Sequence, residues 1–348
     1  MTGSTDPSLL TQTPGPAMTV AQIAELAGVS VPTVSRVING RSDVAPLTRA
    51  KVEEVISRHG FRRLKRPANR AALLELVFHE LAGAYAMEII KGVERVADQN
   101  GLAVVLSEMH GHTPGRGWIE GVLARRPIGV IAVFSGLTPQ QSDQIRSRDI
   151  PFVLLDPTGD PGHEFPSVGA ANWSGGFSAT RHLLDLGHRR IATITGPHGM
   201  LSSRARLDGY RAAMDATGTP VSPELIYEGS FQTEDGLNHG RTLLGLEDRP
   251  TAVVTHNDLQ ALGLYRAAAE ARLRIPDDLS VVGFDDLPLS NWITPPLTTI
   301  RQPLTEMAAA AANLAVTLGR GEVPTHHRME LATDLIVRSS TAPLHAQV

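Results

Sequence analysis

The chain has 348 residues, of which 42% are hydrophobic and 20% are charged, and it contains no cysteine. Disulfide scaffolds, thiolate metal sites and cysteine nucleophiles are therefore excluded, and the length indicates more than one domain. Because no apolar run approaches the ~20 residues that a membrane helix needs, we expect a soluble, cytoplasmic protein.

The charge is distributed unevenly along the chain. Residues 1–17 are rich in Thr, Ser, Pro and Gly and lack the layout of a secretory signal, which predicts a disordered lead-in. Residues 18–70 contain ten basic and four acidic side chains, although the whole chain has a net charge of -4. A basic segment before an acidic body is typical of a polyanion-binding head joined to a different functional body. A solvated pair of basic helices would have the same charge.

Three short helices are predicted within residues 18–60. Thr19 and Gln22 have the spacing of a capping box at the start of the first helix, and Gly28 ends it because glycine accepts a positive φ. Ser30 is then the N-cap of the second helix. Two short helices joined by a glycine turn, with a third helix closing the core, are typical of a helix-turn-helix, and an ordinary three-helix bundle is the alternative.

The second predicted helix has one apolar face and one face of small polar residues. Val34, Val37 and Ile38 have the spacing of buried positions, so the residues between them point outward. Small hydroxyl side chains allow a close approach to base edges in the major groove, and Arg36 can form a bidentate contact to guanine.

This head resembles the DNA-reading head of the lactose-repressor (LacI/GalR) family of transcriptional regulators. The resemblance is carried by the run TVAQIAELAGVS at residues 19–30, followed by TVSRVING at residues 33–40. It implies that the second helix is the recognition helix, and that Val31 and Pro32 occupy the positions that the family varies to choose operators. The implied contacts to phosphates and bases are Thr19, Ser30, Thr33, Ser35, Arg36 and Asn39.

The segment after the head departs from the family pattern. Family members have a hinge helix with an Ala-Arg-x-Leu segment, whose Leu inserts into the minor groove, whereas residues 61–70 read FRRLKRPANR. Leu64 is a candidate for this insertion. We expect instead a basic strap that follows phosphates, with a solvated linker as the alternative. The strap residues are Arg62, Arg63, Lys65, Arg66 and Arg70.

From residue 71 onward, apolar β-rich runs alternate with amphipathic helical stretches. This alternation predicts parallel, doubly wound sheets covered by helices on both faces. Two such units, about 72–169 and 170–296, predict two lobes with a ligand cleft between them. Strands are expected at 74–78, 103–106, 130–134, 152–155, 191–194, 252–255 and 280–284, and helices at 87–99, 177–186, 205–217 and 261–272.

Several segments of the body also resemble the effector-binding core of the same family. They include DLGHRRI at 185–191, SVVGFDD at 280–286 and PPLTTIRQP at 295–303, together with Arg206-x-x-Gly209-Tyr210. The resemblance covers about residues 18–340 and implies the bilobed α/β fold of periplasmic sugar-binding proteins. It places three crossovers between the lobes, near residues 168–171, 296–300 and 326–331. It places lobe 1 at about 71–169 and 297–326, lobe 2 at about 170–296 and 327–340, and a tail at 341–348.

Polar and aromatic side chains near the predicted strand ends are candidate effector ligands. Arg204 matches the sugar-clamping Arg of the family, and its guanidinium can hold two vicinal hydroxyls or a carboxylate. For Asp258 and Asp285 the alternative is helix N-capping, and for Trp173 it is packing. The candidate set is Glu80, Tyr85, Asn172, Trp173, Arg204, Phe231, Asn257, Asp258 and Asp285.

Other constellations do not indicate a metal, a cofactor or catalysis. His110 and His112, or His326 and His327, have no third ligand at a convincing spacing for a metal site. No Gly-x-Ser-x-Gly nucleophile elbow is present.

The sequence therefore predicts a repressor of carbohydrate-utilisation genes rather than an enzyme. It would bind a pseudo-palindromic operator in double-stranded DNA as a homodimer and be released by a small sugar. The short segment after Ser340 has no heptads, so a dimer is expected rather than a coiled-coil tetramer. The alternatives are a family member corepressed by a purine or another small molecule, a cytoplasmic sugar-binding protein without a role on DNA, and a sugar-modifying enzyme.

Overall fold

The computed structural model describes residues 20–38, 44–59, 70–81, 83–109, 116–133, 138–159 and 165–344. The chain divides into two compact units, residues 1–68 and residues 69–348. None of the helices in the described ranges combines the length and the hydrophobicity of a membrane span.

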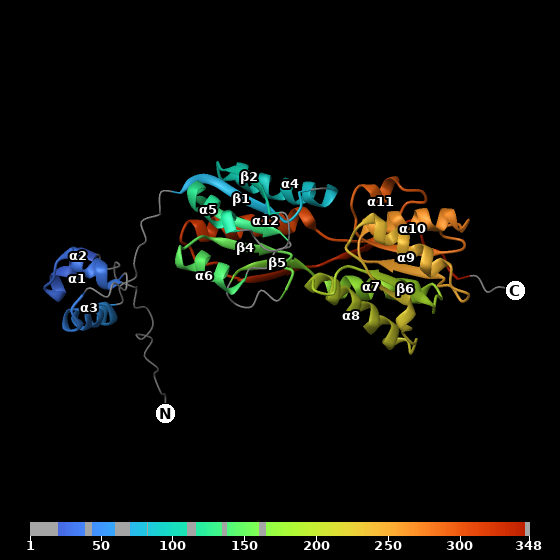
Figure 1. Ribbon diagram of the computed structural model, residues 1–348, viewed down its shortest axis with the longest axis horizontal. Helices are drawn as coiled ribbons and strands as arrows, with labels where there is room; N and C mark the ends of the chain where they lie inside the picture. The colour runs from blue at the N-terminus through green and yellow to red at the C-terminus, as the bar shows by residue number, and fades with distance from the viewer. Residues whose placement is uncertain are drawn as a thin grey trace, which may run out of the picture. The chain divides into compact units, whose positions relative to one another are not determined.

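The first unit contains three helices, α1 (Val20–Ala27), α2 (Val31–Ile38) and α3 (Pro46–His59) (Figure 1). Gly28 has a φ of 62° and allows the tight reversal between α1 and α2. The backbone N–H of Thr33 donates to Ser30 Oγ at 3.3 Å, as expected for an N-cap. The core of the unit is small and apolar, and it consists of Ile23, Ala24, Ala27, Val34, Val37, Val44 and Val52.

These helices confirm the predicted helix-turn-helix head. Val34 and Val37 are buried, as the spacing predicted. Thr19 with its capping box, Asn39 and the predicted lead-in at 1–17 lie outside the described residues.

The second unit contains two six-stranded sheets, one in each lobe. The lobe 1 sheet has the order β11-β5-β4-β3-β1-β2, and all its pairings are parallel. Its strands are β1 (Ala71–Phe78), β2 (Ala103–Glu108), β3 (Pro127–Val133), β4 (Phe152–Leu155), β5 (Ser167–Ala170) and β11 (Arg328–Leu331). Its helices are α4 (Gly83–Gln99), α5 (Arg116–Arg125), α6 (Pro139–Ser147) and α12 (Leu304–Gly319).

The lobe 2 sheet has the order β12-β10-β9-β8-β6-β7, and only the pairing of β12 with β10 is antiparallel among the described strands. Its strands are β6 (Ile191–Thr195), β7 (Ile226–Glu228), β8 (Ala252–Thr255), β9 (Ser280–Asp285), β10 (Thr298–Arg301) and β12 (Asp334–Ile336). Its helices are α7 (Asn172–Asp185), α8 (Leu201–Ala216), α9 (Thr233–Leu244), α10 (Asp258–Glu270) and α11 (Leu289–Trp292), with a short 3-10 turn η1 (Pro223–Leu225).

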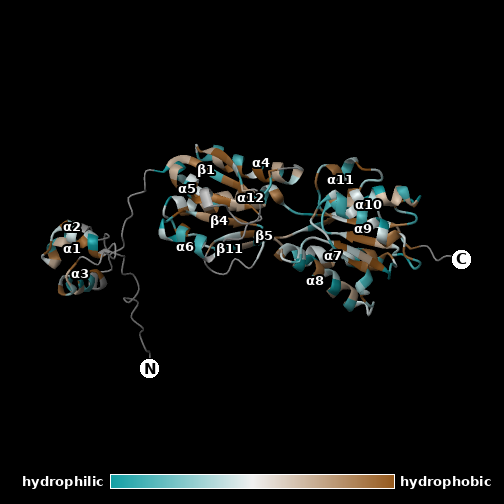
Figure 2. Ribbon diagram, in the orientation of Figure 1, coloured by the Kyte–Doolittle hydropathy of each residue, from teal (hydrophilic) through white to brown (hydrophobic). Residues whose placement is uncertain are grey.

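Each sheet is buried on both faces. In lobe 1, Leu74, Leu76 and Phe78 pack beneath α4 and α12, whereas Val77 packs on the opposite face with the core beneath α5 and α6. The strands of both sheets are mostly hydrophobic, and much of the polar character lies on the helices (Figure 2). This arrangement confirms the predicted doubly wound, bilobed α/β core.

The chain crosses between the lobes three times, at or directly after the three expected segments, although two of the expected lobe boundaries are displaced. The first follows β5, as expected. The second follows β10, which pairs with β9 and therefore belongs to the lobe 2 sheet, although residues 297–326 were assigned to lobe 1. The third lies between β11 and β12, because β11 pairs with β5 of lobe 1 although residues 327–340 were assigned to lobe 2. Both lobe boundaries were misplaced because strands as short as β10 and β11 have no sequence period that reveals their partner.

Candidate functional site

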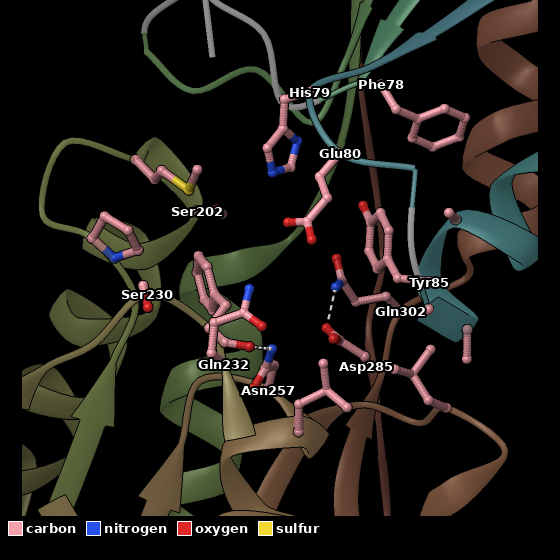
Figure 3. Close-up of a pocket in the computed structure, with 18 of the residues that line it drawn as sticks. Phe78, His79, Glu80, Tyr85, Ser202, Ser230, Gln232, Asn257, Asp285 and Gln302 are labelled. Carbon is pink, nitrogen blue, oxygen red and sulfur yellow. Dashed lines mark hydrogen bonds between the residues drawn. The ribbon is translucent and has the colours of Figure 1, made fainter. Parts of the chain in front are cut away.

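A cavity of about 520 Å³ lies between the two lobes, where the carboxyl ends of both sheets meet (Figure 3). Phe78 at the end of β1 and Asp285 at the end of β9 both line it, and Asn257 follows β8. The carboxyl ends of parallel strands are where open α/β sheets bind ligands, and the volume is within the range of small-molecule sites. The cavity is therefore the candidate ligand site of the second unit.

Aromatic and aliphatic side chains form much of the cavity wall. Tyr85 reaches in from α4 of lobe 1 (Figure 3), and Phe231 lies between β7 and α9 of lobe 2. Phe231 has a φ of 66°, and its ring lies so close to Gly196 that a Cβ on that glycine would overlap it. Glycine at position 196 thus allows the ring to lie flat on the backbone after β6. An apolar wall of this kind suits the C–H face of a sugar ring or the face of a base.

Arg206 is the buried cation of the site and is only 3% exposed. Its Nε donates to Asn172 Oδ1 at 2.8 Å, and its Nη1 donates to the carbonyl oxygen of His256. Its guanidinium carbon lies 3.7 Å from the centre of the Phe284 ring. These contacts fix the plane of the guanidinium, so its remaining N–H groups are held in a defined direction at the cavity.

Asp285 is the main buried carboxyl opposite this cation. It is 7% exposed, its Oδ1 lies 3.8 Å from Arg206 Nη1, and it accepts a hydrogen bond of 2.6 Å from Gln302 Nε2. Burial raises the pKa of Asp285 to about 7, although Arg206 and Gln302 act in the opposite direction. Its φ of 109° is unusual for a non-glycine residue, and strained backbone of this kind is common at ligand sites.

A second buried carboxyl, Asp156, lies in lobe 1 directly after β4. Burial raises the pKa of Asp156 to about 6, while Arg206 and the hydroxyl of Tyr85 act to lower it. Tyr85 donates to Asp156 Oδ2 over 3.5 Å, and burial raises the pKa of Tyr85. The two lobes thus present carboxyl groups to the same arginine, and burial raises the pKa of both carboxyls.

The raised pKa of Asp285 gives a pH dependence of stability with a definite sign. The folded protein binds a proton on the Asp285 carboxyl more tightly than the unfolded chain does. Protonation of Asp285 therefore stabilises the fold fully below the unfolded pKa of 3.8, and this stabilisation is lost as the pH rises through about 7. Between pH 8 and pH 5.5, wild type should gain about 2 kcal/mol of unfolding free energy relative to Asp285→Asn. Urea unfolding of both proteins across this range measures the difference, and parallel pH profiles would contradict it.

Five of the predicted effector residues line the cavity. Glu80 and Tyr85 come from lobe 1, whereas Phe231, Asn257 and Asp285 come from lobe 2. The structure thus brings together side chains that lie up to about two hundred positions apart in the sequence.

The structure places three other predicted residues away from the cavity lining. Trp173 is 46% exposed and stacks on Phe177, with ring centres 5.3 Å apart. Asn172 holds Arg206 in place instead of lining the cavity. Asp258 is fully buried and does not line the cavity, and it accepts hydrogen bonds from Thr299 Oγ1 and from the backbone N–H of Leu287. Helix capping is not its role, because Asn257 is the N-cap of α10.

Arg204 does not occupy the clamp position that was predicted for it. It is exposed on α8 and does not line the cavity. Because α8 starts at Leu201, the inward positions include Ser202 and Arg206, which are four residues apart, and Arg204 lies on the outer face. Arg206 is therefore the arginine at the site.

The sequence prediction also missed several polar residues of the cavity. Gln302 is 4% exposed, and its Oε1 has no hydrogen-bond partner among the described residues. A buried acceptor without a partner is a position where a ligand donor fits. The sequence signal that could have identified Arg206 is its spacing from Tyr210, because a large aromatic residue four positions later lies on the same helix face, and the structure shows that Tyr210 is buried. The other missed polar side chains are His79, Ser202, Ser230 and Gln232.

The outer face of α2 in the first unit carries the predicted DNA contacts. Val31, Pro32, Ser35 and Arg36 are exposed, and Thr33 is half-buried with its hydroxyl 2.8 Å from Ser30 Oγ. The side chains are short except for Arg36, which leaves the helix free to approach base edges.

The predicted basic strap has one member whose position is described. Arg62, Arg63, Lys65 and Arg66 lie outside the described residues. Arg70 donates to the carbonyl oxygens of Gly319 at 2.6 Å and Asp149 at 3.1 Å. Its guanidinium is thus engaged by the core, and this corrects the expectation that Arg70 follows phosphates.

The described ranges contain no group of three or more His, Asp or Glu side chains that could hold a metal ion. The pair His110 and His112, which the sequence did not favour as a metal site, lies outside these ranges.

A helix-turn-helix head followed by a two-lobed α/β unit with a cavity between its lobes defines a class of protein, the ligand-responsive DNA-binding regulators. Comparison with known families gives two matches. Residues 19–63 match the model described as bacterial regulatory proteins, lacI family, and residues 180–341 match the periplasmic binding protein-like domain.

Similar proteins support the same class along nearly the whole chain. The ribose operon repressor of Escherichia coli (strain K12) is 34% identical over 333 residues, which are 92% of this chain and 99% of that protein. The transcriptional regulator DegA of Bacillus subtilis (strain 168) is 31% identical and covers 94% of this chain and 99% of its own length.

Two solved structures show the corresponding fold. The regulator CelR in complex with cellobiose has a TM-score of 0.70 and 33% identity, over 93% of this chain and 99% of that chain. The lac repressor dimer bound to operator and an anti-inducer has a TM-score of 0.68 and 30% identity, over 94% of this chain and 100% of that chain.

The chain belongs to the lacI family of bacterial regulatory proteins, as the resemblance of its head and core indicated. It is a DNA-binding transcriptional regulator with a small-molecule effector. The match over residues 19–63 argues against a sugar-binding protein that has no role on DNA.

Proposed function

We propose that the chain is a repressor of carbohydrate-utilisation genes that binds a pseudo-palindromic operator as a homodimer and leaves it when a small sugar binds between the lobes. The observation that carries this proposal is the fixed pair of Arg206 and Asp285 beside the ring of Phe231. The arginine supplies paired donors for vicinal hydroxyls, the carboxylate supplies acceptors, and the ring covers the C–H face of a sugar.

The charges of the cavity favour a neutral ligand over an anionic one. Arg206 is the only Lys or Arg among the described residues that line the cavity, and it already faces Asp285. Glu80 adds a further carboxylate. A phosphorylated sugar would therefore meet more negative than positive charge, whereas a free sugar satisfies both donors and acceptors. The ribose repressor and the cellobiose complex among the similar proteins support the same class of ligand.

Ligand binding controls DNA binding only if it favours one arrangement of the lobes. To move an equilibrium from 1:99 to 99:1, the ligand must bind one state about 5.5 kcal/mol more favourably than the other. A ligand held by Tyr85 of lobe 1 and Asp285 of lobe 2 would favour the closed arrangement, because only closure brings both sets of contacts to it.

A thermal-shift screen over pentoses, hexoses, disaccharides and purines tests the proposal directly. A sugar that binds the native state should raise the melting temperature, and the same sugar should then release the chain from an operator duplex. A hit from the purines that strengthens DNA binding would instead establish corepression. Sugars that bind without changing DNA affinity would contradict release by the effector.

The recognition helix is tested by Arg36→Ala. Loss of a bidentate contact to guanine should cost about 1–3 kcal/mol of operator binding and relax specificity at one base pair. Fluorescence anisotropy with the preferred duplex and its single-base variants measures both effects. Glu25→Ala, an exposed change on α1, is the control and should retain the base preference. Unchanged affinity and specificity in Arg36→Ala would remove Arg36 from the base contacts.

We also propose that the chain has no enzymatic activity and acts in the cytoplasm, where it meets DNA. The similar proteins support this, since those described above are regulators and repressors. Turnover of a sugar panel with ATP or NAD would contradict it.

A further inference from the structure

Helix α12 extends from the effector cavity to the place where the chain enters the second unit. Gln302 lines the cavity and binds Asp285, and α12 begins two residues later at Leu304. The helix has 16 residues and is therefore about 24 Å long. Its last residue, Gly319, has its carbonyl oxygen bound by Arg70 at 2.6 Å.

Arg70 attaches the beginning of the unit to three parts of lobe 1. Its guanidinium donates to three backbone carbonyl oxygens, those of Gly319 at the end of α12, Ile128 of β3 and Asp149 after α6. The last carbonyls of a helix have no intrahelical partner and carry the negative end of its dipole, so a guanidinium is a suitable cap. Burial lowers the pKa of Arg70, and Asp149 acts in the opposite direction. Arg70 lies directly after the residues that connect the two units.

The packing of α12 prevents it from moving independently of its neighbours. A Cβ on Gly92 of α4 would overlap the carbonyl oxygen of Thr305, and a Cβ on Gly129 of β3 would lie 2.8 Å from that of Ala315. Nine residues of the helix are buried. Contacts this close leave no void to absorb a displacement, so a shift at one end of α12 moves its other end too.

We propose that α12 transmits the state of the effector cavity to the DNA-binding head and that Arg70 is the positioning residue that fixes the connecting segment to this helix. The proposal rests on the proposed function, because it names the route by which occupancy of the cavity reaches the head. A ligand that donates a hydrogen bond to Gln302 Oε1 alters the contact between Gln302 and Asp285, so Gln302 responds to occupancy of the cavity at one end of the route. Arg70 passes the resulting shift to the backbone of Ala71, whose N–H donates to the carbonyl oxygen of Arg126 at 2.8 Å.

A double-mutant cycle on the full chain tests this route without the effector. Gln302→Ala changes the cavity end, and Arg70→Gln or Arg70→Lys changes the other end. The matched control is Arg320→Gln, because Arg320 lies at the same end of α12 but donates to Asn100. One measurement is the Kd for a duplex selected from a random pool by the wild-type chain. The other is amide hydrogen exchange at Ala71 in DNA-free protein.

Gln302→Ala should change the duplex Kd at least fivefold, within the usual range of coupling between sites, and should change the exchange rate at Ala71. In the Arg70→Gln background both changes should fall below about twofold, with an intermediate result for Arg70→Lys, whereas the Arg320→Gln background should retain them. A purely structural Arg70 would lower stability but leave these ratios unchanged.

Equal effects of Gln302→Ala with and without Arg70 would overturn the proposal. It would also be overturned if Gln302→Ala left both measurements unchanged in the wild-type background. If the chain selected no duplex, the proposed function would fail, and the exchange measurement at Ala71 would still decide whether α12 transmits the change.

Discussion

Arg206→Ala should lower the free energy of unfolding by about 3–5 kcal/mol and abolish effector binding. The change leaves the buried carboxyl of Asp285 without its cation, and it removes the donors to Asn172 Oδ1 and to the carbonyl of His256. A buried group that loses its partner costs more than the lost contact itself, because its desolvation is no longer compensated. Urea unfolding measures the stability, and calorimetry with the sugar found by the thermal-shift screen measures the binding.

Arg204→Ala is the matched control for this prediction. Arg204 has the same side chain on the same helix but is exposed, so its removal should change stability by less than about 0.5 kcal/mol and leave effector binding intact. Arg206→Lys separates charge from geometry, since a lysine keeps the cation but loses the planar pair of donors. If Arg204→Ala lost effector binding and Arg206→Ala retained it, Arg204 would be the arginine that contacts the effector.

Gly209→Ala should destabilise the chain by about 1–3 kcal/mol even though alanine is the better helix former. Gly209 lies where α8 crosses α7, and a Cβ there would overlap the carbonyl oxygen of Trp173 and lie 2.7 Å from the backbone nitrogen of Phe177. Both obstacles are backbone atoms, so α8 as a whole must move away. Because α8 also carries Arg206, the same change should weaken effector binding.

Gly199→Ala serves as the control, because a Cβ at this position meets nothing within 4 Å and its φ is not in the left-handed region. Thermal unfolding and effector titration of both variants decide the outcome. An increase in melting temperature for Gly209→Ala would mean that helix propensity outweighs the close crossing, and that α7 and α8 can separate at little cost.

The parts of the fold that the sequence predicted are those with a strong hydrophobic pattern. The strands with long apolar runs, such as β1, β3 and β9, were found, as was the helix-turn-helix with its glycine corner. The short strands β10, β11 and β12 were not expected as strands. They have three or four residues each, and their pairing is determined by contacts with distant parts of the chain rather than by a local pattern.

The candidate site was predicted in part, and its errors share one cause. The helix after β6 was expected to start at residue 205, which put Arg204 in the preceding turn, but α8 starts at Leu201 and turns Arg204 outward. Trp173 similarly falls in the first turn of α7, one position after the inward Asn172. A shift of a few residues in a helix start changes which side chains face inward, and helix starts are the least certain feature of a sequence prediction.

The three crossings between the lobes have a consequence for the order of synthesis. Lobe 2 takes most of its strands from one continuous stretch, β6 to β10, whereas lobe 1 opens with β1 and receives α12 and β11 only near the end of the chain. On the ribosome, lobe 1 is therefore begun first but stays incomplete until after β6 to β10 of lobe 2 have been made. Until α12 emerges, Leu74, Leu76 and Phe78 lack one of the two helices that cover them. The nascent chain thus exposes part of a hydrophobic surface while roughly two hundred further residues are synthesised, and a holdase chaperone can bind this surface during that interval.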